Sequence, residues 1–258
     1  MRVVVAFLLF VFSATGLRCQ QDFARQTVQQ SGLWVTPTLH LHYKKFSLNV
    51  EAHFRFNEFK RNQQHLLYAI PDYKVNEYIT IAPVGYARVW NFIYGKLPAA
   101  VPENEHRLLE QILLRFKAGR VRFSSRLRFE QRWTEHKTHN SLDAYAKRGY
   151  VFTNRFRFRI AAEIPLTHHN QNHLGWFVYV SDECFISFGR AVSYKLPDQN
   201  RAQVGIGYHV NSFLKCTAGY LHQLIIRSNG AKAESNHNLT IGVQVSLDAA
   251  KKHRLASH

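Results

Sequence analysis

Arginine occupies most of the alternate positions in two stretches of the sequence, and glutamate accompanies it in both. The first is "RVRFSSRLRFEQRW", residues 120–133, and the second is "RFRFRIAAE", residues 155–163. A guanidinium group binds carboxylates and phosphates through parallel hydrogen bonds. The pattern therefore supports two interpretations: an internal network of arginine–glutamate ion pairs, or a basic conduit or pocket for an anionic solute or lipid head group.

Aromatic residues stand between these arginines, which is also a feature of nucleic-acid surfaces, where bases stack on rings between phosphate contacts. Such a surface needs both residue types on one face. In an extended strand successive side chains point to opposite faces, so the rings and the arginines separate. We expect no nucleic-acid partner.

Three histidines, His168, His169 and His173, cluster in "THHNQNH" and are weak candidates for a metal site. Imidazole is a common metal ligand, but no carboxylate or cysteine stands at a recognised zinc spacing, and a solvated polar loop accounts for the stretch equally well. Ser235 and His237 lie two residues apart without a nucleophile-elbow motif around them. The sequence thus predicts no catalytic residue, no metal and no cofactor.

Long strands would position these side chains. In "FSLNVEAHFRFN", residues 46–57, apolar and polar residues alternate without a break, and "RAQVGIGYHV" and "NLTIGVQVSL" repeat the pattern. At roughly ten to fifteen residues, the strands exceed the five or six of typical globular strands. They match the length that a tilted strand needs to cross a bilayer. Further strands are expected at about 33–43, 63–74, 77–90, 104–118, 119–133, 149–163, 173–186 and 213–226.

The N-terminal stretch "MRVVVAFLLFVFSATGLRCQQ" has the layout of a secretory signal peptide, with Arg2 before an apolar run and small residues after it. We assign residues 1–19 to this peptide, with cleavage after Gly16 or before Gln20. Arg18 argues against a lipoprotein modified at Cys19. The chain is therefore expected to be exported. Its 34 Lys+Arg against 17 Asp+Glu favour lipid head groups, lipopolysaccharide or anionic solutes as partners.

These features predict an all-β fold, a transmembrane antiparallel up-and-down β-barrel at residues 33–248 with a basic tail at 249–258. A soluble sandwich or lipocalin-like barrel, with its apolar face inward, is the alternative. Outer-membrane barrels have even strand counts, so a first strand hidden within residues 20–32 would give about 12 strands, and 10 stays open. Short turns are expected near 43–45, 74–77, 117–120 and 211–213, and longer links near 91–104, 134–148, 164–172, 187–199 and 227–236.

In a membrane barrel the charged face must point into the lumen, because an arginine on the lipid face costs about 2–4 kcal/mol near the midplane. The charged network expected in the lumen comprises Glu51, Arg55, Arg122, Arg126, Arg128, Glu130, Arg132, Arg155, Arg157, Arg159, Glu163 and Arg201. The residues expected to face lipid are Phe46, Leu48, Val50, Phe54, Phe56, Phe123, Leu127, Phe129, Val204, Ile206, Ile241, Val243 and Val245.

The C-terminal "TIGVQVSL" resembles the last-strand signal by which outer-membrane barrels are recognised for assembly, with Gly242, Val245 and Leu247 at its characteristic positions. It departs from the usual form because it lacks a terminal aromatic residue and precedes a basic tail. We expect the barrel-assembly machinery to be a partner.

Five stretches together resemble the domain of unknown function 2490 family of uncharacterised bacterial outer-membrane β-barrel proteins. They are "ENEHRLLEQILLRF", "SSRLRFEQRW", "QNRAQVGIGYHVN", "AGYLHQ" and "NHNLTIGVQ", and the resemblance extends from about Leu33 to Leu247. It implies an outer-membrane barrel and supplies no biochemical activity.

We therefore expect an integral protein of the bacterial outer membrane, reached through the periplasm and surrounded by outer-membrane lipid and lipopolysaccharide. Its function would be structural, or that of a narrow, porin-like channel or binding barrel for small anionic solutes, without enzyme activity. The alternative is a lipid or lipopolysaccharide hydrolase or acyltransferase at the rim.

Overall fold

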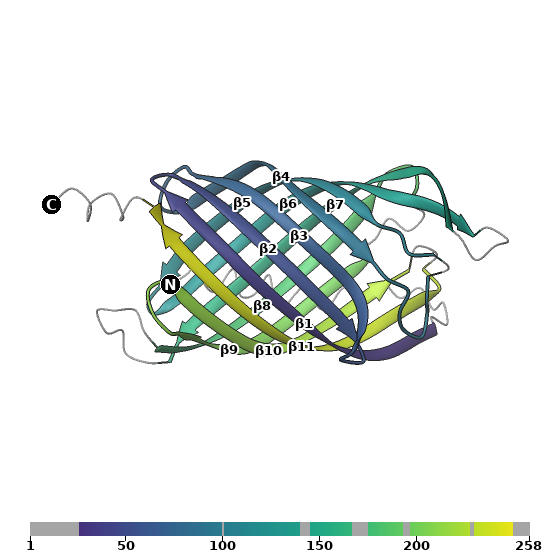
Figure 1. Ribbon diagram of the computed structural model, residues 1–258. Coiled ribbons are helices and arrows are strands. Elements are labelled where there is room, and N and C mark those ends of the chain that lie inside the picture. Colours follow the sequence, from purple (N-terminus) through teal and green to yellow (C-terminus); the bar gives the residue numbers. More distant parts are fainter. Residues whose placement is uncertain are drawn as a thin grey trace.

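The computed structural model describes residues 26–99, 101–139, 145–166, 175–192, 197–227 and 230–249. These residues form eleven strands that close into a barrel (Figure 1). The strands are β1 (Gln26–Tyr43), β2 (Phe46–Asn57), β3 (Arg61–Lys74), β4 (Ile79–Asn91), β5 (Glu105–Ala118), β6 (Val121–His139), β7 (Tyr145–Pro165), β8 (Gly175–Phe188), β9 (Gln199–His209), β10 (Leu214–Ile226) and β11 (Lys232–Asp248).

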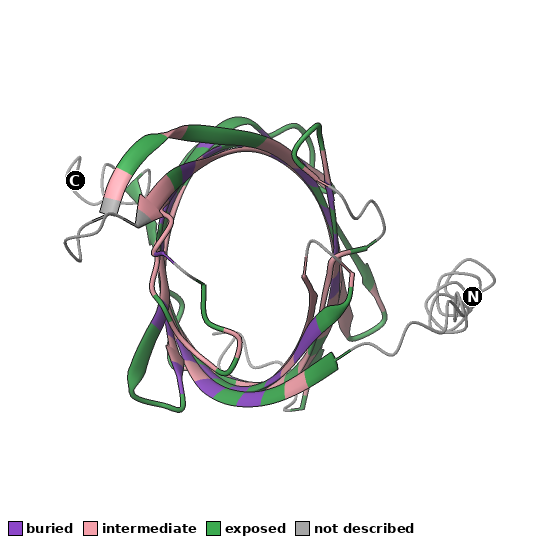
Figure 2. Cartoon of the chain, turned by 90° about the vertical axis from the view of Figure 1, so that its right-hand side faces the viewer, coloured by how far each residue is buried: buried purple, intermediate pink, exposed green. Residues whose placement is uncertain are grey.

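Each strand pairs with its neighbours in the chain, and β1 pairs with β11 to close the ring, which Figure 2 shows along the barrel axis. All pairs are antiparallel except β1 and β11, which run parallel with Gln26 opposite Lys232 and His42 opposite Asp248. The parallel seam follows from the odd strand count, since the first and last of eleven alternating strands have the same direction. The expectation of a wholly antiparallel barrel is thus wrong at this seam.

The strand count is near the expected twelve, but no separate first strand exists in the described part of the N-terminal segment. Residues 26–43 form a single strand of 18 residues. The predicted boundary at residue 33 therefore falls inside β1, just after the polar residues Gln29, Gln30 and Ser31. In the structure the alternation continues through them, and the side chain of Gln30 is buried.

The turns separate the two ends of the barrel. The end where β1 finishes, at Tyr43, carries the tight connections 44–45, 75–78, 119–120 and 210–213 and is called the short-turn end. The opposite end, with the 92–104 connection, is called the long-loop end. The long link expected at 134–148 is wrong, because β6 and β7 continue as a paired hairpin to His139 and Tyr145 beyond the rest of the barrel (Figure 1). The link expected at 227–236 is likewise shorter, since β11 begins at Lys232.

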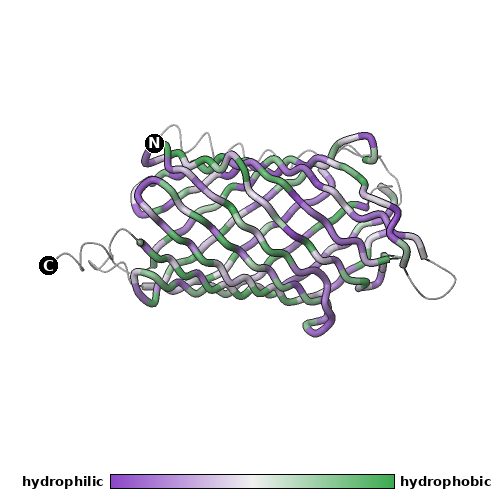
Figure 3. The backbone as a smooth tube through the Cα atoms, turned by 45° about the horizontal axis from the view of Figure 1, so that its top comes forward, coloured by the Kyte–Doolittle hydropathy of each residue, from purple (hydrophilic) through white to green (hydrophobic). Residues whose placement is uncertain are grey.

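Polar and apolar residues alternate along the strands (Figure 3), so that the inner face is mostly polar and the outer face mostly apolar. One sector of the inner face is apolar, the cluster of Leu66, Tyr68, Ile70, Ala82, Ala87, Val89 and Leu109 on β3–β5. These side chains fill part of the barrel interior. Within the described residues, no helix is long and apolar enough to span a membrane.

Glycines on β9 and β10 make room for two large inward side chains of β8. A Cβ atom at Gly207 would lie 2.1 Å from the Phe177 ring, and one at Gly205 or Gly219 would lie within 2.6 Å of the Tyr179 hydroxyl. A glycine in the interior of a strand commonly accommodates a large neighbour in this way. Phe177 and Tyr179 therefore pack closely against the backbone of β9 and β10.

Candidate functional site

The described residues enclose two cavities in the lumen. The larger has a volume of about 1020 Å³ and extends to Tyr78 at the short-turn end. The smaller, of about 230 Å³, lies toward the long-loop end and reaches Tyr94. Four side chains line both cavities and define the central layer, where the two meet: Arg55, Tyr68, Arg157 and Arg201.

Two buried carboxylates bind Arg157 of the central layer and the arginines next to it. Glu130 has no exposed surface and accepts hydrogen bonds from Arg155 Nε at 2.9 Å and Arg157 Nη1 at 2.6 Å. Glu183 accepts from Arg157 Nη2 at 2.9 Å and from Arg126 Nη2 at 2.6 Å. Because Arg157 bridges the two carboxylates, the charges of β6, β7 and β8 form one connected network.

Aromatic rings support the same arginines from the sides. The guanidinium carbon of Arg55 lies 4.0 Å from the centre of the Trp34 ring, and that of Arg201 lies 5.0 Å from it. Arg157 and Arg201 also lie 4.8 and 4.6 Å from the Phe185 ring. Such contacts stabilise cations whose hydration has been removed. The central layer is thus held in place without a carboxylate for every arginine.

A second network lies on the long-loop side of the central layer. Glu105 accepts hydrogen bonds from Arg107 Nε at 2.8 Å and from Arg132 Nη2 at 2.8 Å. Arg128 lines the larger cavity instead, and it donates from Nε and Nη2 to the amide oxygen of Gln111, at 3.0 and 2.7 Å. The smaller cavity is therefore walled by arginines whose positions are fixed.

The 92–104 connection is fastened across the long-loop end. Lys96 donates its backbone N–H to Gln30 Oε1 at 3.2 Å, and Arg227 Nη2 donates to the carbonyl of Leu97 at 3.1 Å. Burial raises the pKa of Tyr94 and of Glu103 in this connection. The loop therefore sits inside the barrel mouth and narrows the smaller cavity.

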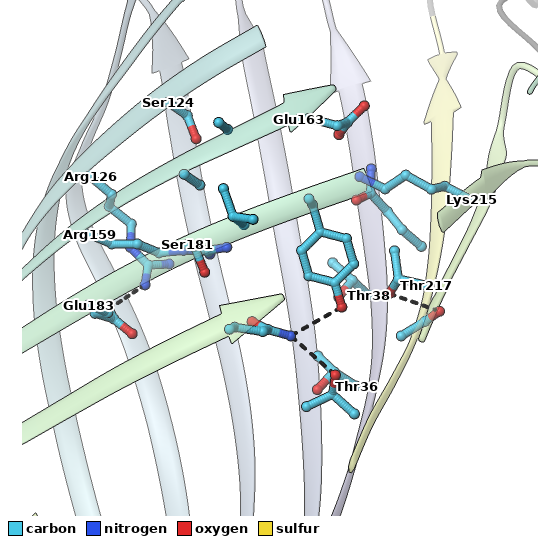
Figure 4. Close-up of a pocket in the computed structure, with 18 of the residues that line it drawn as sticks. Thr36, Thr38, Ser124, Arg126, Arg159, Glu163, Ser181, Glu183, Lys215 and Thr217 are labelled. Carbon is cyan, nitrogen blue, oxygen red and sulfur yellow. Dashed lines mark hydrogen bonds and ion pairs between the residues drawn. The ribbon is translucent and has the colours of Figure 1, made fainter. Parts of the chain in front are cut away.

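The larger cavity holds cations that are less fully paired. Arg122 contacts Glu163, whose carboxylate also lies 3.5 Å from His209 Nε2. Arg159 has no ion-pair partner within 4.0 Å among the described residues, and Figure 4 shows it beside Arg126 at the cavity wall. Ten arginines and lysines line this cavity against four carboxylates, and seven arginines line the smaller cavity against Glu105 alone. Both spaces therefore carry an excess of positive charge.

The structure brings together the charged residues expected in the lumen. Eleven of the twelve line one or both cavities, and Glu130 lies behind the wall in contact with Arg155 and Arg157. Of the residues expected to face lipid, eight are large exposed side chains: Phe46, Leu48, Phe54, Leu127, Val204, Ile206, Ile241 and Val243. The other five are half-buried among their neighbours: Val50, Phe56, Phe123, Phe129 and Val245. Phe123, Ile241 and Val243 also contribute atoms to the wall of the larger cavity.

Sequence analysis missed several residues of the site. Glu183 interrupts an apolar run and was not assigned to the lumen, although it is separated by even spacings from the inward Ser181 and Phe185. Glu105, Arg107 and Gln111 alternate in the same way in β5, with Leu109 between them. In both strands a mixture of apolar and polar residues on the inner face hides the pattern.

The other residues considered for chemistry lie apart from the lumen. His222 Nε2 is 2.9 Å from Ser235 Oγ, and Tyr220 Oη is 2.6 Å from His237 Nδ1. These four side chains project from β10 and β11 on the outer face. No carboxylate of the described residues hydrogen-bonds to His222, so the Ser235–His222 pair has no group that would orient the imidazole as a base.

The predicted metal candidates, signal peptide, assembly signal and basic tail lie partly outside the described residues. The described residues contain no group of three or more His, Cys, Asp or Glu side chains that could hold a metal, and His168, His169 and His173 lie outside them, as does the signal peptide at 1–19. Gly242, Val245 and Leu247 lie in β11, where Gly242 lines the larger cavity and Leu247 is exposed. Of the tail at 249–258, only residue 249 is described.

Comparison with solved structures finds a similarity to the NanC porin, with a TM-score of 0.46 and 12% sequence identity over 81% of this chain and 91% of that one. Comparison with curated proteins gives no match. The profile of one protein family matches residues 31–234, from the middle of β1 into β11, and thus most of the barrel. The chain belongs to the family described as "Protein of unknown function (DUF2490)".

Proposed function

We propose that this protein is an outer-membrane β-barrel whose lumen admits and binds small anions, as a narrow anion-selective channel. The observation that carries the proposal is the excess of cations around the larger cavity, and Arg159 in particular. Buried charges must be paired or hydrated. An arginine without a carboxylate partner therefore retains water and attracts anions from solution.

The location is part of the proposal. Strands of 11 to 21 residues with an exposed apolar outer face suit a bilayer, in which a closed barrel leaves no unpaired strand edge. Recovery of the mature chain in outer-membrane fractions, with heat-modifiable migration on gels, is the expected result. Recovery as a soluble periplasmic monomer without detergent would refute this location.

The central layer limits what can pass. Arg55, Arg157 and Arg201 are held by aromatic contacts and ion pairs and stand where the two cavities meet. A barrel of this size is far from the 16–18 strands that leave a wide aqueous channel in porins. We therefore expect a small conductance and a preference for compact anions over large solutes.

Single-channel recording in a planar bilayer under a salt gradient tests the function. The unmodified protein is expected to give an anion-selective reversal potential, and Arg159→Glu to reduce or reverse that selectivity. Arg159 is the appropriate target because Arg126 and Arg157 bind buried carboxylates, and their replacement would disturb the barrel itself. Arg61→Glu, with the same charge change at the exposed start of β3, is the matched control and should leave the selectivity unchanged. Cation selectivity of the unmodified protein, or silence of a correctly folded barrel, would refute the channel.

A further inference from the structure

A cluster of basic residues lies on the outer face of the barrel, separate from the lumen, and could form a second binding site. It consists of Arg88 on β4, Lys137 on β6, and Lys147 and Arg148 on β7, and it is called the outer basic cluster. None of its four cations lines either cavity. The network of the lumen therefore does not account for their gathering here.

Three of the four cations surround one carboxylate. Glu135 lies 2.9 Å from Lys137 Nζ, 3.7 Å from Lys147 Nζ and 3.9 Å from Arg88 Nη2. Arg148, the fourth cation, donates from Nε to Thr138 Oγ1 at 3.2 Å. One carboxylate neutralises one charge, so the cluster keeps a net positive charge while its side chains stay ordered around Glu135.

The position of the cluster indicates what it meets. Its strands pair in the order β4–β5–β6–β7, and Arg88, His106, Trp133 and Phe152 follow one another across them as paired neighbours. Trp133 packs on Phe152 with ring centres 5.1 Å apart, and Trp90 and Tyr150 are exposed beside them. Aromatic side chains at this level form the girdle that marks a membrane–water interface in outer-membrane barrels. The outer basic cluster therefore lies at head-group level.

The end of the barrel at which the cluster lies indicates the membrane leaflet that it contacts. Glu135 and Lys137 lie near the end of β6 at the long-loop end, where β6 and β7 project beyond the other strands (Figure 1). In outer-membrane barrels the longer loops face the cell exterior. The lipid of that leaflet is lipopolysaccharide, whose membrane anchor is a disaccharide with phosphate groups and acyl chains.

We propose that the outer basic cluster is a binding site for the phosphate groups of lipid A. Lysine and arginine bind phosphate through charge-assisted hydrogen bonds, and the aromatic residues below them offer a surface for acyl chains. Neighbouring strands are about 4.8 Å apart, so a cluster across four strands can meet both phosphates of a bis-phosphorylated disaccharide. The assignment rests on the proposed outer-membrane location, but not on conduction through the lumen.

Native mass spectrometry of the full-length protein in detergent, with bis-phosphorylated lipid A as the probe, tests the site. The triple variant Lys137→Gln, Lys147→Gln, Arg148→Gln is expected to raise the Kd for lipid A by at least about tenfold, because each basic residue near a charged lipid surface contributes to binding. The matched control is Lys44→Gln, Lys45→Gln, Lys74→Gln, which removes the same charge at the short-turn end and should leave the Kd unchanged. Monophosphoryl lipid A should bind more weakly than the bis-phosphorylated form.

Two results would overturn the assignment. One is equal loss of binding in the triple variant and its control, which would indicate general charge attraction; the other is equal affinity for phosphatidylglycerol and lipid A, which would indicate an unspecific phospholipid contact. Anion selectivity of the triple variant, recorded in a planar bilayer, should equal that of the unmodified protein. Failure of this site and failure of the channel are thus distinguishable.

Discussion

Arg157 Nη1 of β7 lies 2.6 Å from Glu130 Oε1 of β6, at the level where the two cavities of the barrel meet. The same arginine donates from Nε and Nη2 to Glu183 Oε1 of β8, at 3.1 and 2.9 Å. One guanidinium group therefore joins three adjacent strands through two carboxylates. This connection makes the central layer part of the wall of the barrel as well as the level at which its two cavities meet.

Glu130→Gln is expected to destabilise the barrel strongly. The amide removes the negative charge that Arg155 and Arg157 share, and breaking a buried pair in this way costs about 3–5 kcal/mol. The change in stability is measured by unfolding the protein in urea, with loss of heat-modifiable migration on gels as the signal for unfolding. Glu58→Gln is the matched control, since Glu58 pairs with Arg61 in an exposed turn, where an ion pair contributes less than about 1 kcal/mol. Equal effects of the two substitutions would show that the lumen is hydrated enough to screen its charges.

Arginine placed on the two faces of one strand should have opposite consequences. Ile206→Arg puts a cation on the exposed outer face of β9 and is expected to impair insertion by about 2–4 kcal/mol if that position lies near the bilayer midplane. Gln203→Arg puts the same residue on the inner face, where Gln203 lines the larger cavity, and should permit assembly. The yield of folded barrel in outer-membrane fractions distinguishes them. Comparable yields would show that the outer face of β9 does not contact lipid.

The glycine at position 207 should be required only because of Phe177. In Gly207→Ala the new methyl group would overlap the Phe177 ring, and the three nearest atoms all belong to that side chain. Overpacking of this kind costs about 1–3 kcal/mol. In a protein that already carries Phe177→Ala, the substitution Gly207→Ala should cause little further loss of stability. A double-mutant cycle on urea unfolding measures this difference. Additive effects would show that the glycine serves the backbone instead.

The sequence was sufficient to predict the barrel and the face of its strands that carries charge, because strict alternation over ten or more residues matches the two-residue period of a strand and not that of a helix. Arg122, Arg126 and Arg128 alternate with Phe123, Leu127 and Phe129 without exception, and the structure places these arginines at the cavity walls. The same logic failed at the first strand, where polar residues such as Gln30 occupy inward positions next to outward Gln29 and Ser31.

The division of the lumen could not be predicted from the sequence. It depends on contacts between side chains from strands far apart in the chain, such as Arg201 on β9 over Trp34 on β1. The pairing of β1 with β11 that brings them together is set by closure of the barrel, and no local pattern encodes it. Likewise, alternation assigned Arg126, Arg157 and Arg159 to one face, but only the positions of Glu130 and Glu183 show which arginines are paired.

The access of reagents to the larger cavity, and the sign of the electrostatic potential inside it, can be tested without measuring a conductance. We consider Ser181→Cys in a background with serine at Cys184 and Cys216, since Ser181 lines the larger cavity near Arg126 and Arg159 (Figure 4). A positive potential concentrates anions and repels cations, so a negatively charged thiol reagent should react with Cys at this position faster than a positively charged one of similar size. We expect a ratio of rates of about ten or more.

Ser212→Cys, in an exposed turn at the short-turn end, is the matched control and should show little preference. Adding Arg159→Gln to the Ser181→Cys variant should lower the ratio, because no carboxylate of the described residues lies within 4.0 Å of that arginine. If both positions show the same ratio, the excess positive charge of the arginines in the lumen is neutralised by bound anions, and it cannot be the basis of anion selectivity.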